Sequence, residues 1–363
     1  MSFDVSLKAW LALSLTRGLG GESARRLLKE FGSPDAVFTA SASSLKAVVK
    51  PDVAAQISAG IPDNDIAPAL LWLEDHNNHI VTLADEDYPQ ALLNIPDPPL
   101  LLYVKGRADL LNHPALAVVG SRNATPQGLS NAEAFSKTLS DSGLCIISGM
   151  AHGIDAAAHR GALQGLGGSV AIVGTGLDKV YPAANRALAH QLAEEGALIS
   201  EFPLGTPPLA ANFPRRNRLI SGMSAGCLVV EAGLQSGSLI TARLALEQGR
   251  DVFAIPGSIH APQSKGCHAL LKQGAKLVET AQDILEELNS PILATARTSP
   301  SPDTSTQGAA FDLIGHLGFD PVDVDTLSMR CGLTVAELSA MLLILELEGR
   351  VSTLPGGLYQ RIQ

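Results

Sequence analysis

Apolar residues recur at intervals of three and four positions over roughly the first 80 residues, the spacing of helices that bury one face. Gly18, Gly20 and Gly21 interrupt this pattern in "LTRGLGGESARRLL", which predicts a helix, a tight hairpin and a second helix. Residues 1–80 are therefore expected to form a helical domain. The hairpin can offer backbone N–H groups to a phosphate, as helix-hairpin-helix modules do, but packing or oligomerisation is the simpler interpretation of a single hairpin.

The pattern changes between residues 85 and 288, where short apolar runs alternate with helical stretches. The runs are rich in Val and Ile, and most end in Gly or a small polar residue. Nearly continuous apolar strands separated by helices are typical of a parallel sheet covered on both faces. This segment is predicted to be a doubly wound, Rossmann-like α/β domain. Its expected strands are "ALAVVG", "CIISG", "SVAIVG", "GALISEF", "GCLVVEA" and "DVFAIPG".

The C-terminal part has a third pattern. Residues 289–307 are rich in Pro, Ser and Thr, as in a flexible linker. Residues 308–363 predict three short helices and a hairpin, with Thr334 and Glu337 spaced as a capping box, so a winged-helix domain is expected. The third helix, where a DNA reader carries basic side chains, contains glutamates and no Lys or Arg. A protein-contact or packing role is therefore favoured over major-groove binding.

Composition narrows the class of protein. Apolar residues make up 46% and charged residues 17%, enough for a sizeable core. No apolar run approaches the ~20 residues of a membrane span, and the N-terminus lacks the features of a secretory signal, so a cytoplasmic protein is expected. The four cysteines form no C-x-x-C pair, and neither a metal nor a cofactor is predicted. The net charge of -10 opposes nucleic-acid binding overall, but the middle segment is nearly neutral and has room for a local positive surface.

Ligands of open α/β domains bind at the carboxyl ends of the strands. Gly120, Ser121 and Arg122 follow the first expected strand, with Thr125 as the N-cap of the next helix, and this arrangement predicts a phosphate site. Similar turns follow the next two strands, and together they are expected to face one edge of the sheet. Their candidate residues are Gly149, Gly174, Gly176, Lys179 and Arg186.

The stretch "NFPRRNR" places Arg215, Arg216, Asn217 and Arg218 beside an apolar segment. Unpaired guanidiniums are costly to bury, so these arginines need an anionic partner. Single-stranded DNA supplies phosphates that Arg binds in bidentate fashion. The alternative is that some of these arginines pair internally with carboxylates, in which case their replacement unfolds the domain.

An enzyme of Rossmann-like fold is the competing hypothesis. Gly174 and Gly176 begin a dinucleotide fingerprint, but Lys179 stands at the position of its third glycine, and no P-loop is present. Asp155, Glu201 and Glu231 lie near strand ends, where carboxylates serve as catalysts, helix caps or arginine partners. The P-G-G-x-G-T-x-x-E motif of phosphoribohydrolases is missing. A nucleotide-processing enzyme therefore stays the alternative to a non-enzymatic DNA-binding protein.

Several long motifs in register, among them "SGMAHGIDAAAHRGAL", "ISEFPLGTPPLAANFPRRNRLISGM" and "VVEAGLQSGSLITARLALEQGRDVFAIPG", resemble the bacterial DNA-processing protein A family, DprA or Smf. The flanking segments are similar to the sterile-alpha-motif-like and winged-helix domains of that family. The resemblance implies a homodimer that binds and protects single-stranded DNA and loads the RecA recombinase onto it in natural transformation and recombination. It implies no established catalytic activity.

The resemblance also implies nucleic-acid-binding residues. Arg122 matches the arginine of the family's glycine-serine-arginine turn. His268 departs from the family pattern, so no contact is carried over to it, and Arg215 adds a charge where the pattern is permissive. Ala183 stands where some relatives have lysine; either Arg186 compensates for it or the pocket is less basic. The other matching residues are Arg216, Asn217 and Arg218, then Ser236, Gly237, Ser238 and Thr241.

Overall fold

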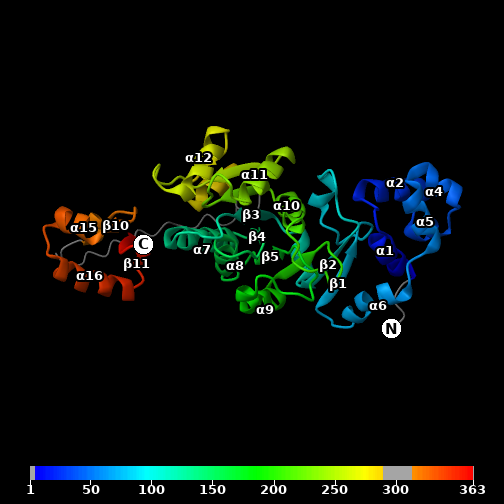
Figure 1. Ribbon diagram of the computed structural model, residues 1–363, viewed down its shortest axis with the longest axis horizontal. Coiled ribbons are helices and arrows are strands. Elements are labelled where there is room, and N and C mark those ends of the chain that lie inside the picture. Colours follow the sequence, from blue (N-terminus) through cyan, green and yellow to red (C-terminus); the bar gives the residue numbers. More distant parts are fainter. Residues whose placement is uncertain (1–4, 289–312, 363) are drawn as a thin grey trace.

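The structure is a computed structural model that describes residues 5–288 and 313–362. N-terminal helices lie at one end, a large sheet with its helices occupies the centre, and a small α/β unit lies at the other end (Figure 1). This arrangement agrees with the predicted Rossmann-like domain flanked by a helical and a winged-helix domain. The predicted linker, residues 289–307, falls outside the described residues.

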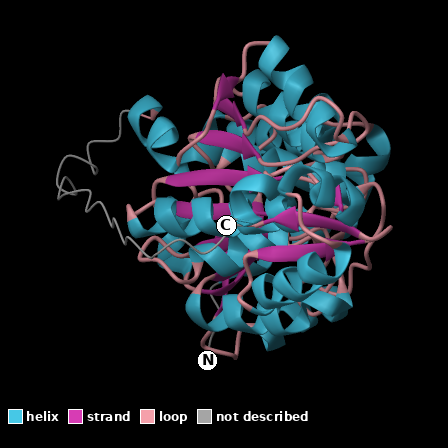
Figure 2. Cartoon of the chain, turned by 90° about the vertical axis from the view of Figure 1, so that its left-hand side faces the viewer, coloured by secondary structure: helices cyan, strands magenta, loops and turns pink. Residues whose placement is uncertain are grey.

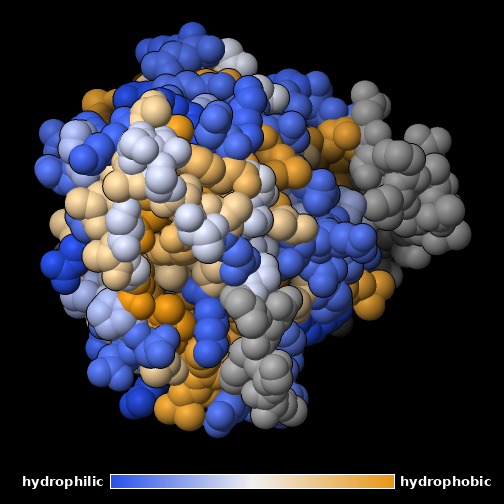
Figure 3. Space-filling model, turned by 90° about the vertical axis from the view of Figure 1, so that its right-hand side faces the viewer, coloured by the Kyte–Doolittle hydropathy of each residue, from blue (hydrophilic) through white to orange (hydrophobic). Residues whose placement is uncertain are grey.

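The N-terminal helices pack around a core that includes Leu13, Leu27, Leu45 and Ile57, all nearly inaccessible to solvent. Their outer surface carries apolar side chains among polar ones (Figure 3). Serine side chains cap two of the short helices, which fixes where each begins. The helices are α1 Val5–Leu15, α2 Gly21–Phe31, α3 Pro34–Thr39, α4 Ala42–Val48, α5 Pro51–Ala59 and α6 Asp63–Trp72.

The central sheet has nine strands in the order β1-β2-β6-β5-β4-β3-β7-β8-β9. The six predicted strands are all present, and they pair in parallel with one another. They are β3 Ala115–Val119, β4 Cys145–Ser148, β5 Ser169–Ile172, β6 Ala197–Ser200, β7 Gly226–Val229 and β8 Asp251–Ala254.

Three further strands, two on one side and one on the other, extend this sheet beyond the prediction. Strands β1 Asn78–Thr82 and β2 Leu101–Gly106 run antiparallel, with β2 paired to β6. Strand β1 crosses the boundary expected near residues 80–85. The end of the segment predicted to be helical therefore contributes a strand to the central sheet. Strand β9 Lys276–Leu277 has two residues, too few to show any periodicity in the sequence.

Helices cover both faces of the sheet (Figure 2), as its two apolar faces require. Leu219, Ala242 and Leu270 pack in the core of one face, while Ala132 and Ala157 pack in the core of the other. The helices are α7 Pro126–Asp141, α8 Ile154–Ala162, α9 Arg186–Glu195, α10 Asn212–Gly222, α11 Ser238–Glu247, α12 Lys265–Lys272 and α13 Ala281–Glu287. Short 3-10 turns are η1 Gln90–Asn94, η2 Ala108–Asn112, η3 Ala183–Asn185 and η4 Pro262–Ser264.

The C-terminal unit has the helices and hairpin of a winged helix, as predicted. Thr334 and Glu337 form the expected capping box, in which Thr334 N donates to Glu337 Oε2 over 2.9 Å. Of the described helices, none alone is long and apolar enough to cross a membrane, although the bent pair α15 and α16 meets that test jointly. The elements are α14 Leu313–Leu317, β10 Val322–Asp323, α15 Val324–Cys331, α16 Val335–Leu347, β11 Val351–Leu354 and β12 Leu358–Arg361.

Candidate nucleic-acid interface

A pocket of about 750 Å³ opens at the switch point of the sheet, where the order of the strands along the chain changes direction. From β3 the sheet grows through β4, β5 and β6 on one side, and through β7, β8 and β9 on the other. The carboxyl ends of β3 and β7 diverge at this point, and open α/β sheets bind ligands in the resulting crevice. The volume is within the range of small-molecule sites.

The structure brings about half of the predicted site residues together around this pocket. They come from the turn after β3, the turn after β7 and helices α10 and α11. The predicted residues that line it are Gly120, Ser121, Arg122, Arg216, Asn217, Ser236, Gly237, Ser238 and Thr241. The predicted residues outside the lining are Gly149, Gly174, Gly176, Lys179, Arg186, Arg215 and Arg218.

The N-terminus of α11 borders the pocket and, among the described residues, is not filled by a carboxylate, although Ser238 N donates to Ser236 Oγ at 3.4 Å and Leu239 N to the Ser236 carbonyl at 3.1 Å. Its N-cap residue, Gly237, makes no side-chain cap, and no atom lies within 4 Å of the position that a Cβ would take there. The hydroxyls of Ser236 and Ser238 lie 2.7 Å apart beside it. A ten-residue helix that presents its positive end to a hollow provides a site for an anion.

Arg122 supplies a positive charge at the mouth of the same pocket. Its side chain is exposed, and its guanidinium carbon lies 6.0 Å from the centre of the Phe213 ring. The ring of Tyr181 lies 5.6 Å from that of Phe213, and both aromatic residues line the pocket. Neither aromatic was among the predicted site residues. Each precedes a proline, but that signal alone does not place the two rings together.

The N-terminus of α7, where the sequence predicted a phosphate site, is already filled by a carboxylate of the same chain. Glu231 accepts hydrogen bonds from Thr125 N at 2.9 Å and from Thr125 Oγ1 at 2.6 Å. A Cβ at Gly128 would clash with this carboxylate, so glycine is needed in the first turn of α7. Burial raises the pKa of Glu231, and the bonds from Thr125 oppose that shift. A phosphate is therefore excluded from this helix end, which corrects the prediction.

The turn after β4 is also filled by the chain itself. Asp155 accepts hydrogen bonds from Gly149 N at 3.2 Å and from Ala151 N at 3.3 Å. Gly153 has a φ of 77° and lies directly against the Ser121 carbonyl, where only a residue without a side chain fits. The expected anion site after β4 is therefore closed by neighbouring backbone.

The turn after β5 is closed in a similar way. A Cβ at Gly174 would lie 3.0 Å from the Phe213 ring, and Gly176 N donates to the Thr206 carbonyl at 3.0 Å. Lys179 pairs with Asp178 at 3.8 Å, and Arg186 begins α9 as an exposed side chain outside the pocket lining. The turn at α11 differs from those after β3 and β4 in that no carboxylate of the described residues accepts from its N–H groups, which bond to Ser236 and Gly237 instead.

Arg216 forms part of the pocket floor but is held from within. Its side chain is buried, and Nη1 donates to the Gly149 carbonyl at 2.7 Å and to the Ile172 carbonyl. Desolvation lowers the pKa of Arg216 to about 10, while the nearby Asp155 carboxylate acts in the opposite direction. Burial raises the pKa of Asp155, and Arg216 opposes that shift. Arg216 therefore ties the ends of β4 and β5 together above Asp155.

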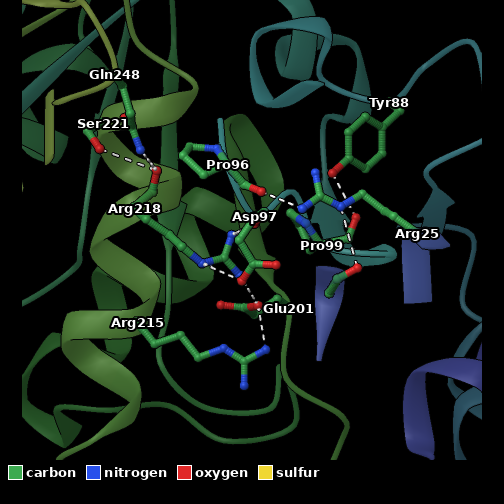
Figure 4. A network of polar contacts seen from close by, with 11 residues as sticks. Arg25, Tyr88, Pro96, Asp97, Pro99, Glu201, Arg215, Arg218, Ser221 and Gln248 are labelled. Atoms are coloured by element: carbon green, nitrogen blue, oxygen red, sulfur yellow. Dashed lines mark hydrogen bonds and ion pairs between the residues drawn. The ribbon is translucent and has the colours of Figure 1, made fainter. Parts of the chain in front are cut away.

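Arg218 and Arg215 turn away from the pocket toward Glu201 (Figure 4). Arg218 donates to the Glu201 carboxylate and to the Asp97 carbonyl, and Arg215 Nη2 donates to Glu201 Oε2 over 3.0 Å. The Glu201 side chain is only 2% exposed and that of Arg218 13%, whereas Arg215 is 58% exposed. The sequence analysis gave pairing with a carboxylate of the same chain as the alternative to DNA binding. For Arg218, the structure contains that internal ion pair.

The loop that meets Arg218 also holds the N-terminal hairpin. Arg25 of α2 donates to the Pro96 carbonyl, and Tyr88 Oη donates to the Pro99 carbonyl at 2.8 Å (Figure 4). Gly21 packs so closely against the Asp97 carboxylate that a side chain there would clash. The hairpin end thus faces an acidic residue, which agrees with a packing role rather than phosphate binding.

Comparison with known sequences identifies the family. The family described as "DNA recombination-mediator protein A" matches residues 79–289, and "DprA winged helix domain" matches residues 295–357. The chain belongs to the DNA recombination-mediator protein A family. Protein Smf of Escherichia coli is 42% identical over 370 residues, which cover 99% of this chain and 96% of that protein. DNA processing protein DprA of Streptococcus pneumoniae is 48% identical over 206 residues, 57% of this chain and 73% of that protein.

Solved structures of family members share the fold. DNA processing protein A from Streptococcus pneumoniae has a TM-score of 0.68 at 39% identity, covering 77% of this chain and 97% of that one. DNA processing protein A from Helicobacter pylori, whose structure is described for its single-stranded DNA binding mode, has a TM-score of 0.53 at 30% identity. That match covers 58% of this chain and 95% of the Helicobacter protein.

Proposed function

We propose that the chain binds single-stranded DNA in the pocket between the ends of β3 and β7. The observation that carries the proposal is that the positive end of the α11 dipole and the exposed guanidinium of Arg122 border the same hollow. A helix dipole and a guanidinium together favour a phosphate diester. The single-stranded DNA binding described for the Helicobacter relative supports the same ligand class.

Phosphates occupy the polar half of the pocket in this proposal, near Ser236, Ser238 and Arg122. The rings of Tyr181 and Phe213, which lie beside Arg122, offer apolar surface to a base in the same pocket. Because stacking and backbone contacts do not distinguish base edges, little sequence preference is expected.

We further propose that the bound strand is protected and handed to the RecA recombinase during recombination and natural transformation. This part of the proposal rests on family membership. On the same basis we propose that the protein acts as a homodimer in the cytoplasm and catalyses no reaction. An assay for turnover of nucleoside monophosphates distinguishes this non-enzymatic role from the nucleotide-processing alternative. Release of base or phosphate would favour the enzyme.

A mobility-shift titration of the full chain against matched single-stranded and duplex oligonucleotides tests the binding proposal. Preference for the single strand is expected, because an unpaired strand can place its bases against the two rings while the phosphates face α11. With roughly four to six phosphates neutralised, log affinity against log salt should have a slope of about -3 to -4. Equal binding of the duplex, or an affinity that does not change with salt, would contradict the proposal.

A further inference from the structure

Helix α16 of the winged helix is apolar on two opposite sides. Leu338 and Leu342 are fully buried in the core of the unit, yet Leu343 is 57% exposed, Ile344 55% and Leu347 81%. A helix side formed by large apolar residues is normally covered by another element. The outer side of α16 has the composition of a buried surface, but no element of the described residues packs against it.

The exposed side chains follow the spacing of a helix–helix contact. Ala336, Ala340, Leu343 and Leu347 are separated by four, three and four positions, the alternation of a coiled-coil seam. We call these four residues the α16 seam. Small residues at its beginning allow a second helix to approach closely, and the two leucines at its end give that helix a surface to bury.

The flanks of the seam are acidic. Glu337 lies on one side and Glu346 on the other, both exposed, and Glu348 follows the helix end. The helix has no Lys or Arg. In a helix pair, the flanking positions select the partner by charge.

We propose that the α16 seam docks a basic amphipathic helix of another protein, with apolar residues at seam spacing and Lys or Arg beside them. A second copy of this chain is not favoured by charge, because its α16 has no Lys or Arg to pair with Glu337 and Glu346. Duplex DNA is disfavoured by the same charges, although this helix is the usual DNA reader of a winged helix. The seam lies in the unit at the opposite end of the molecule from the N-terminal helices (Figure 1).

The test uses the full chain and three labelled synthetic peptides of three heptads. One has Leu at the seam positions and Lys beside them, the second has Glu in place of Lys, and the third is a scrambled version of the first. Binding is followed by fluorescence anisotropy at physiological salt. The seam variant is Leu343→Ser with Leu347→Ser. The matched control is Leu71→Ser with Leu246→Ser, which changes two exposed leucines elsewhere.

The wild-type chain should bind the Lys peptide at least about tenfold more tightly than the scrambled or Glu peptide. The seam variant should lose about tenfold or more of that affinity, the control variant should keep it, and both should bind single-stranded DNA like the wild type. Equal binding by the seam variant, or equal binding of the Glu peptide, would overturn the proposal. It would also be overturned if sedimentation velocity shows self-association that the seam variant abolishes, because the occupant is then a second copy.

Discussion

The two sides of helix α10 make opposite use of their polar residues. Arg215 and Arg218 are three positions apart, so they share one side of the helix and both reach Glu201. Asn217 lies on the pocket side, where the exposed guanidinium is contributed by Arg122 from another loop. A dense run of arginines in a sequence is therefore not by itself a DNA site. The acidic residue that folds against each arginine decides whether it is available.

The largest effect is expected on the Glu201 side. Arg218→Ala leaves a buried carboxylate with only the half-exposed Arg215 as its partner. The free energy of unfolding should fall by about 3–5 kcal/mol, as when other buried ion pairs lose one member. Urea denaturation measures the loss.

The matched control is Arg215→Ala, which should lower stability by less than about 1 kcal/mol, because the Arg215 end of the pair is exposed and Glu201 keeps Arg218 as its partner. Adding Glu201→Gln to Arg218→Ala should restore part of the lost stability, because the uncompensated charge is removed. If Arg218→Ala instead leaves stability unchanged and weakens DNA binding, then Arg218 contacts DNA, and the assignment of a structural role to the Glu201 side of α10 is wrong.

The Arg218→Ala variant should also respond to pH. Burial raises the pKa of Glu201, and Arg218 opposes that shift, so removing Arg218 raises this pKa further. A carboxyl with a raised folded-state pKa contributes stability below its unfolded pKa and loses it as pH rises through the folded value. The difference in unfolding free energy between wild type and variant should therefore be smallest at acid pH and grow toward neutrality.

A smaller effect, on binding rather than folding, is expected at the pocket. Arg122→Ala should weaken single-stranded DNA binding by about 10- to 100-fold, since a charge-assisted hydrogen bond contributes about 1.5–3 kcal/mol. The salt slope should become shallower by about 0.7 for the one lost phosphate contact. Arg243→Ala, which removes an exposed arginine of α11 outside the pocket lining, serves as the control. Equal losses for both variants would indicate non-specific attraction.

The smallest effect concerns the turn that carries Arg122. Glu231 holds this turn in two ways. Ser121 N donates to the Glu231 backbone carbonyl at 2.7 Å, and the Glu231 carboxylate accepts hydrogen bonds from Thr125. Glu231→Ala should reduce single-stranded DNA affinity by roughly 3- to 10-fold, the worth of one or two hydrogen bonds. Glu231→Gln keeps an acceptor for Thr125 and should retain most of the affinity. Identical losses for the two variants would show that charge, rather than positioning, is what matters.

The sequence was sufficient for the parallel sheet and for the edge of that sheet at which the pocket opens. Six strands had continuous apolar runs, and the Gly120–Arg122 turn and the Ser236–Ser238 turn both follow such runs. It was insufficient for the direction of the charged side chains. Whether Glu231 caps α7 or Glu201 binds Arg218 depends on contacts between residues far apart in the chain. The antiparallel strands β1 and β2 were missed because β1 lies across the boundary assumed between two segments.

Chemical modification of arginine side chains, with and without a bound oligonucleotide, tests the central claim most directly. Arg122 and Arg215 are both exposed and able to react with phenylglyoxal, which mass spectrometry then quantifies residue by residue. If the strand lies between α11 and the turn after β3, single-stranded DNA should protect Arg122 strongly and leave Arg215 as reactive as in the free protein. Protection of Arg215 with unchanged modification of Arg122 would contradict this location of the DNA site.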